Sequence, residues 1–130
     1  MPDASKKPPT TVLVVEDELL VRIDIGSRLR AEGFVVFEAG HADEAIGILE
    51  KHSDIHVVFT DIDMPGSMDG LKLATYVRER WPPVKLIVTS GHSSPKEDGL
   101  PNGGRFFPKP YELQHITSAI AELIAAEAES

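Results

Sequence analysis

The sequence predicts an α/β protein with a doubly wound, five-stranded parallel sheet and helices on both faces. Short apolar runs of strand length alternate along the chain with segments of helical periodicity, which is typical of parallel strands joined by helices. The chain has 130 residues, of which 42% are hydrophobic, and this suits one domain with one proper core. Polar residues capable of chemistry follow almost every apolar run.

The first half of the chain supplies three predicted strands and two predicted helices. Continuous apolar runs, rich in β-branched residues, predict strands over 11–15, 34–38 and 57–60. Between these strands, apolar residues recur at intervals of three and four. This period predicts helices over 20–31 and 41–51, and Gly33 is well placed as the residue that ends the first of them.

The second half continues the same alternation. Asp69 is placed to cap a third helix, which Pro82 and Pro83 end. Further apolar runs predict strands over 84–89 and 105–107. A stripe of apolar residues then predicts the final helix; its members are Leu113, Ile116, Ile120, Leu123 and Ile124.

The segment between the last two predicted strands interrupts this regularity. Residues 93–104 contain two prolines and three glycines. Inside a helix a proline costs about 3 kcal/mol and a glycine about 1 kcal/mol. We therefore expect a fourth helix that is short or degenerate, in a mobile segment.

Composition narrows the class of protein. The formal net charge is −8, which argues against a nucleic-acid partner, because phosphate backbones are bound by clustered Lys and Arg. The chain has no cysteine, hence neither a disulfide framework nor a thiolate metal site, and no run approaches the roughly 18 apolar residues of a membrane span. We expect a cytoplasmic protein without a membrane partner.

Residues 1–9 are expected to form a disordered tail, and residues 10–130 one domain.

Polar residues at the ends of the predicted strands are the main functional signal. Since the carboxyl ends of parallel strands meet at one edge of a sheet, we expect these residues to converge there. Carboxylates crowded in this way repel one another, which raises their pKa values or requires a cation. Mg²⁺ suits such a site, because it accepts one or two carboxylates and leaves positions for phosphate oxygens. The residues concerned are Glu16, Asp17, Asp61, Ser90 and Lys109.

From Thr11 to Ala126 the chain resembles the receiver domain of two-component response regulators, of the stand-alone, chemotaxis-regulator-like type. The motifs are an acidic pair after the first strand, Asp-x-Asp-Met-Pro-Gly after the third, Ser-Gly after the fourth and Lys-Pro after the fifth. The resemblance implies a flavodoxin-like fold. It also implies that Asp61 accepts a phosphoryl group from a histidine kinase or a phosphotransfer protein.

The resemblance further assigns roles to the surrounding residues. Glu16 and Asp17, together with Asp61, would place Mg²⁺, and the backbone carbonyl of Asp63 would complete the coordination. Ser90 would donate a hydrogen bond to the phosphoryl group, and Lys109 would pair with it. Phe106 would be the aromatic switch, which turns inward as the hydroxyl is drawn to the phosphate. The Asp63 side chain and His92 would tune the rate at which the acyl phosphate is hydrolysed.

Alternatives remain open at the level of sequence. The switch hydroxyl is either Thr89 or Ser90, and Ser90 is preferred because the small residue Gly91 follows it. An aspartate-nucleophile phosphatase also uses an Asp-x-Asp motif, but after its first strand. A receiver-like module that binds partners without phosphorylation is expected to lack an acid, the hydroxyl or the lysine, and this chain lacks none of them.

The preferred hypothesis is a phosphorelay switch that signals through altered protein contacts, not a turnover enzyme. The downstream partner, and an effector domain after Ser130, are left open.

Overall fold

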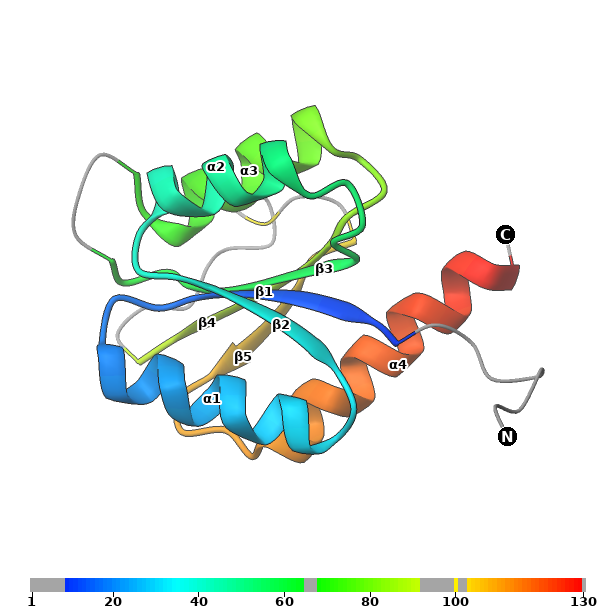
Figure 1. Cartoon of the computed structure of the whole chain (residues 1–130), viewed down its shortest axis with the longest axis horizontal. Helices are drawn as coiled ribbons and strands as arrows, with labels where there is room; N and C mark the ends of the chain where they lie inside the picture. The colour runs from blue at the N-terminus through cyan, green and yellow to red at the C-terminus, as the bar shows by residue number, and fades with distance from the viewer. Residues whose placement is uncertain (1–8, 65–67, 92–99, 101–102, 130) are drawn as a thin grey trace.

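A computed structural model of the chain has a five-stranded sheet with strand order β2-β1-β3-β4-β5, in which every neighbouring pair is parallel. It describes residues 9–64, 68–91, 100 and 103–129. In Figure 1, α2 and α3 cover one face of the sheet, while α1 and α4 cover the other. The predicted fold class is therefore confirmed.

Each strand and the first three helices lie within about one residue of their predicted positions, and the final helix begins at Leu113, the first residue of its predicted stripe, and extends beyond Ile124, the last. The strand predicted over 34–38 begins and ends one residue later, and so does the strand predicted over 84–89. The elements are β1 (Thr11–Val15), α1 (Leu19–Ala31), β2 (Val35–Ala39), α2 (Ala42–Lys51), β3 (Val57–Asp61), α3 (Gly70–Arg80), β4 (Lys85–Ser90), β5 (Arg105–Pro108) and α4 (Leu113–Glu129).

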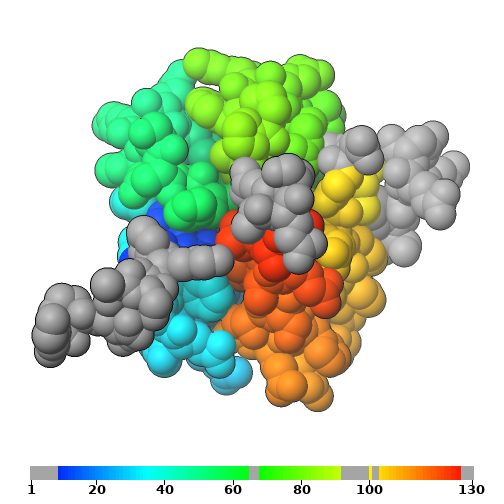
Figure 2. Space-filling view, turned by 90° about the vertical axis from the view of Figure 1, so that its right-hand side faces the viewer, coloured from blue at the N-terminus to red at the C-terminus, as the bar shows by residue number. Residues whose placement is uncertain are grey.

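The core consists of two apolar clusters, one on each face of the sheet. Successive residues of a strand point to opposite faces, so Val58 packs in the cluster under α2 and α3, whereas Phe59 packs in the cluster under α1 and α4. Strands β1 and β3 are buried along their whole length. Figure 2 shows the same layers from the end at which the strands begin, with α4 in orange and red. This double burial explains why the strands are continuous apolar runs.

Local signals in the sequence fix the ends of several helices. The Asp69 side chain caps α3 by accepting a hydrogen bond from the Lys72 backbone N–H at 2.9 Å, as predicted. Gly33 follows α1 with a φ of +97°, a left-handed conformation that favours glycine. Gly70 begins α3 against the end of β3: a Cβ there would lie only 2.7 Å from the Asp61 carbonyl carbon. The helix can therefore approach Asp61 only because residue 70 has no side chain.

Two predictions concern residues that the structure does not describe. Most of the segment expected to hold a degenerate fourth helix, residues 92–99 and 101–102, lies outside the described residues, and so does most of the expected tail, residues 1–8. Both expectations, and the assignment of residues 10–130 to one domain, remain predictions. Among the described residues, no helix combines the length and the apolar character needed to cross a bilayer.

Candidate functional site

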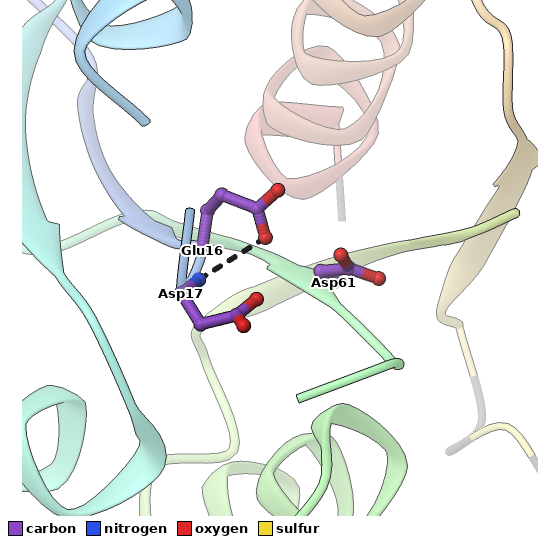
Figure 3. Close-up of side chains that lie close together, drawn as sticks. All are labelled: Glu16, Asp17 and Asp61. Carbon is purple, nitrogen blue, oxygen red and sulfur yellow. Dashed lines mark hydrogen bonds between the residues drawn. The ribbon is translucent and has the colours of Figure 1, made fainter. Parts of the chain in front are cut away.

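The strand ends bring the predicted site residues together at one edge of the sheet. Asp61 is the last residue of β3, and Ser90 is the last residue of the neighbouring β4. Glu16 follows directly after β1, on the other side of β3, and Lys109 follows β5. Figure 3 shows the carboxyl groups of Glu16, Asp17 and Asp61 in this region. The parallel topology thus gathers residues that lie far apart in the sequence.

Three carboxyl groups form the centre of the site. One oxygen from each of Glu16, Asp17 and Asp61 lies within 4.8 Å of the others. Glu16 and Asp61 are buried, with 3% and 5% exposure, whereas Asp17 is exposed. Burial raises the pKa of Glu16 from 4.5 to about 8, with further contributions from a hydrogen bond to Asp61 and from its negative charge. The cluster therefore has the excess of negative charge expected of a cation site.

Lys109 supplies a positive charge to this cluster. Its Nζ lies 2.9 Å from Asp61 Oδ2 and 3.7 Å from Glu16 Oε1. Partial burial lowers the pKa of Lys109, but the hydrogen bond and charge of Asp61, helped by the charge of Glu16, outweigh that effect and leave the pKa raised. The ammonium group therefore stays charged at neutral pH and offers its N–H donors beside the Asp61 carboxylate.

The two candidate hydroxyl groups have different partners. Thr89 donates its hydroxyl hydrogen to the backbone carbonyl of Phe107 at 2.6 Å, so it is used within the sheet. Ser90 donates instead to Asp63 Oδ2 at 2.6 Å, and the Gly91 backbone N–H points to the same oxygen at 3.3 Å. The backbone N–H of Asp63 in turn donates to Asp61 Oδ1 at 3.0 Å. Of the two, the Ser90 hydroxyl is connected to the acidic cluster.

A small open cavity adjoins these groups. Its volume is about 150 Å³, and its walls include Asp17, Asp61, Asp63 and Lys109. Hard oxygen donors around a space of this size fit a divalent cation that keeps part of its hydration shell, as Mg²⁺ does.

Two contributors to the site were not predicted from the sequence. Arg22, on α1, donates from Nη1 to the Glu16 backbone carbonyl at 2.8 Å. Gly70 permits the close approach of α3 to Asp61. A charged residue on an amphipathic helix usually belongs to its solvated face, so periodicity gave no signal for Arg22. For Gly70, its position directly after the capping residue Asp69 was the available signal, because glycine is unfavourable inside a helix.

Comparison with known proteins identifies the family to which this arrangement belongs. A family model described as the response regulator receiver domain matches residues 12–121. The chain belongs to this receiver family. The matched region contains every residue of the site described above and all of the sheet except Thr11, the first residue of β1.

Curated relatives contain the receiver as one part of a longer protein. The chain is 35% identical over 121 residues to the sensor kinase CckA of Brucella abortus, and the match covers 88% of this chain and 12% of that protein. It is 31% identical over 121 residues to the transcriptional regulatory protein PdtaR of Mycobacterium tuberculosis, with 91% and 58% covered. The chain thus spans from 12% to 58% of the length of these relatives.

Solved structures agree with the assignment. A response regulator receiver protein from Sinorhizobium medicae superposes with a TM-score of 0.80 at 28% identity, covering 91% of this chain and 96% of that one. The receiver domain of the hybrid histidine kinase CckA gives a TM-score of 0.73 at 30% identity, with 87% and 97% covered. A CheY-like receiver from Methanospirillum hungatei, at 24% identity and a TM-score of 0.82, supports the fold.

Phe106 and His92 are the two remaining residues to which a role was predicted. Phe106, on β5, is half-buried and packs against the cluster under α2 and α3. It pairs in register with Val88 of β4, two residues before Ser90. Its predicted role as a switch remains a prediction. His92, predicted to tune hydrolysis, lies outside the described residues.

Proposed function

We propose that Asp61 accepts a phosphoryl group from a phosphohistidine of a histidine kinase or a phosphotransfer protein. The observation that supports this proposal best is the environment of the Asp61 carboxylate. It is almost fully buried, borders an open cavity and lies 2.9 Å from the Lys109 ammonium group. A nucleophile held beside a fixed positive charge suits phosphoryl transfer, in which positioning and electrostatic stabilisation do most of the work.

Phosphoryl transfer to Asp61 forms one bond to phosphorus and breaks another. A carboxylate oxygen of Asp61 forms a bond to phosphorus while the bond from phosphorus to the donor's histidine nitrogen breaks. The bonding electron pair stays on that nitrogen, and the product on this chain is an acyl phosphate. The Asp63 N–H and Lys109 hold the two oxygens of Asp61 and fix the orientation of its carboxylate before the reaction.

We propose Mg²⁺ as the cofactor, held by the acidic cluster. Carboxylate oxygens of Glu16, Asp17 and Asp61 would bind it, with the Asp63 backbone carbonyl as a further oxygen donor. When bound, Mg²⁺ neutralises negative charge on the phosphoryl oxygens. Lys109 then turns its N–H donors from the carboxylate to a phosphoryl oxygen, and the Ser90 hydroxyl leaves Asp63 for another. The protein signals through the resulting change in its protein contacts and acts as a switch.

An apolar surface next to the site supports docking of the phosphoryl donor. Along α1, Leu19, Leu20 and Ile23 are 56%, 80% and 47% exposed. A groove of about 460 Å³ runs beside this helix and reaches Lys109, with Tyr111 in its wall. Exposed apolar patches of this kind mark sites of protein interaction. A donor seated there would present its phosphohistidine to Asp61.

Intact-mass measurement tests this function. With Mg²⁺ and acetyl phosphate as a small phosphodonor, the mass should rise by one phosphoryl group. Asp61→Asn should abolish the increase because an amide is a poor nucleophile. Asp54→Asn, an exposed acid elsewhere on the surface, is the matched control and should be labelled like the unmodified protein. Labelling that persists in Asp61→Asn would refute the assignment, and sustained turnover of phosphomonoesters would favour a phosphatase.

A further inference from the structure

One peptide group joins two of the three acids in the site. It links Glu16 to Asp17, and both of its polar atoms are engaged. The carbonyl oxygen accepts a hydrogen bond from Arg22 Nη1 at 2.8 Å, and the N–H donates to Glu16 Oε2 at 3.1 Å. The orientation of this peptide group fixes the relative positions of the two side chains that start on either side of it.

Arg22 is itself held from a second direction. Its Nε lies 3.6 Å from Glu38 Oε1, and the two side chains are only 18% and 23% exposed. Its Nη1 also passes close to Gly40, where a Cβ would lie 3.1 Å away. The guanidinium group therefore lies in a confined space between the end of β2 and the loop that carries Glu16 and Asp17.

A neighbouring arginine provides a useful contrast. Arg30, on the same helix, also pairs with Glu38, at 3.0 Å, and also donates to a backbone carbonyl, that of Val36, at 3.0 Å. Its side chain is 49% exposed. The two arginines thus share an acidic partner and a type of hydrogen bond, but of these two only Arg22 touches the peptide group of the site.

We propose that Arg22 is a positioning residue of the cation site: it fixes the Glu16–Asp17 peptide group so that the two carboxylates face the same ion. This inference rests on the proposed Mg²⁺ site and names a residue that acts on it through the backbone. Without the guanidinium group, the Glu16 carbonyl turns toward water and the cation has to order the loop when it binds. Residues that orient metal ligands typically contribute 10- to 100-fold to metal affinity. We therefore expect Arg22→Gln to weaken Mg²⁺ binding by about tenfold or more.

Calorimetric titration with Mg²⁺ tests the proposal. Arg22→Gln should show the full loss, and Arg22→Lys a smaller one, because lysine keeps the charge but lacks the planar fork that reaches two acceptors. Arg30→Gln is the matched control, since it removes the same charge and an ion pair with the same acid, Glu38. The Mg²⁺ affinity of Arg30→Gln should stay within about twofold of that of the unmodified protein. Equal weakening in Arg22→Gln and Arg30→Gln would show a general charge effect and overturn the proposal.

A second measurement separates positioning from general damage to the fold. In acetyl phosphate labelling, Arg22→Gln should raise the Mg²⁺ concentration needed for half the maximal rate, and leave the rate at saturating Mg²⁺ nearly unchanged. A lower rate at saturating Mg²⁺ contradicts a positioning role. If Arg22→Gln does not fold, Glu38→Gln loosens the guanidinium group instead, and its Mg²⁺ affinity should fall several-fold; unchanged affinity there overturns the inference. Normal Mg²⁺ binding by Arg22→Gln would overturn this inference alone. If the unmodified protein binds no Mg²⁺, the proposed cofactor itself is wrong.

Discussion

Binding of Mg²⁺ should release a proton from the site. Burial and the neighbouring Asp61 raise the pKa of Glu16 to about 8, so the metal-free cluster retains a proton at neutral pH. A carboxylic acid is a poor ligand for a hard cation, and the metal therefore has to displace this proton.

The size of the effect follows from the pKa. With a pKa of about 8, the group is protonated in roughly ten of every eleven molecules at pH 7 and in about one of eleven at pH 9. Mg²⁺ binding should therefore release about 0.9 proton at pH 7 and about 0.1 at pH 9. The apparent affinity should rise by up to about tenfold per pH unit below pH 8 and level off above it.

Titration calorimetry in several buffers measures this number directly. At a fixed pH, the slope of the observed heat against the ionisation heat of the buffer gives the number of protons released. The slope should fall from pH 7 to pH 9, and Glu16→Gln should bring it close to zero at pH 7. Mg²⁺ binding with a slope of zero in the unmodified protein would refute the reasoning. A slope that Glu16→Gln leaves unchanged would assign the proton to another group.

Three further perturbations test other parts of the site. Asp17→Asn should raise the melting temperature of the metal-free protein, because it relieves repulsion in the cluster, and should reduce the stabilisation by Mg²⁺; a lower melting temperature without metal would make Asp17 structural. Beryllofluoride mimics a phosphoryl group on Asp61. Asp63→Ala should increase the affinity for it several-fold more than Asp63→Asn does, because asparagine still accepts the hydrogen bond from Ser90. Equal effects of the two substitutions would show that only the charge of Asp63 matters. Gly70→Ala should lower the free energy of unfolding by about 2 kcal/mol or more in urea titrations, since its Cβ would lie 2.7 Å from the Asp61 carbonyl carbon; unchanged stability would contradict that close approach.

The sheet and the convergence of its polar ends were predictable because two simple rules apply to them. A parallel strand buried on both faces is a continuous apolar run, and the start of β1 at Thr11 and its end at Val15 follow directly from the run. Parallel strands also end on one edge, so the meeting of Asp61 with Glu16 and Lys109 required only the correct fold class. Neither rule depends on the details of side-chain packing.

Hydrogen-bond partners within the site were not predictable in the same way. Adjacent hydroxyl groups at Thr89 and Ser90 point to opposite faces of a strand, and the choice between them depends on where β4 ends relative to its neighbours. The contact of Arg22 with the Glu16 carbonyl depends on how α1 is rotated against β1 and β2. Rotation and register are set by the packing of the whole core, which a local pattern does not specify.

The pairing of Ser90 with Asp63 indicates where the cost of switching falls. If the Ser90 hydroxyl moves to a phosphoryl oxygen on Asp61, the Asp63 carboxylate loses a hydrogen bond of 2.6 Å, while Asp61 keeps its position at the end of β3. The same movement acts on β5, because the Lys109 N–H donates to the Ser90 carbonyl at 2.9 Å and Phe106 pairs with Val88. If the proposed function is right, a residue change at position 63 should alter the balance between the two states of the switch and leave the nucleophile in place, whereas a change at position 61 should abolish phosphorylation.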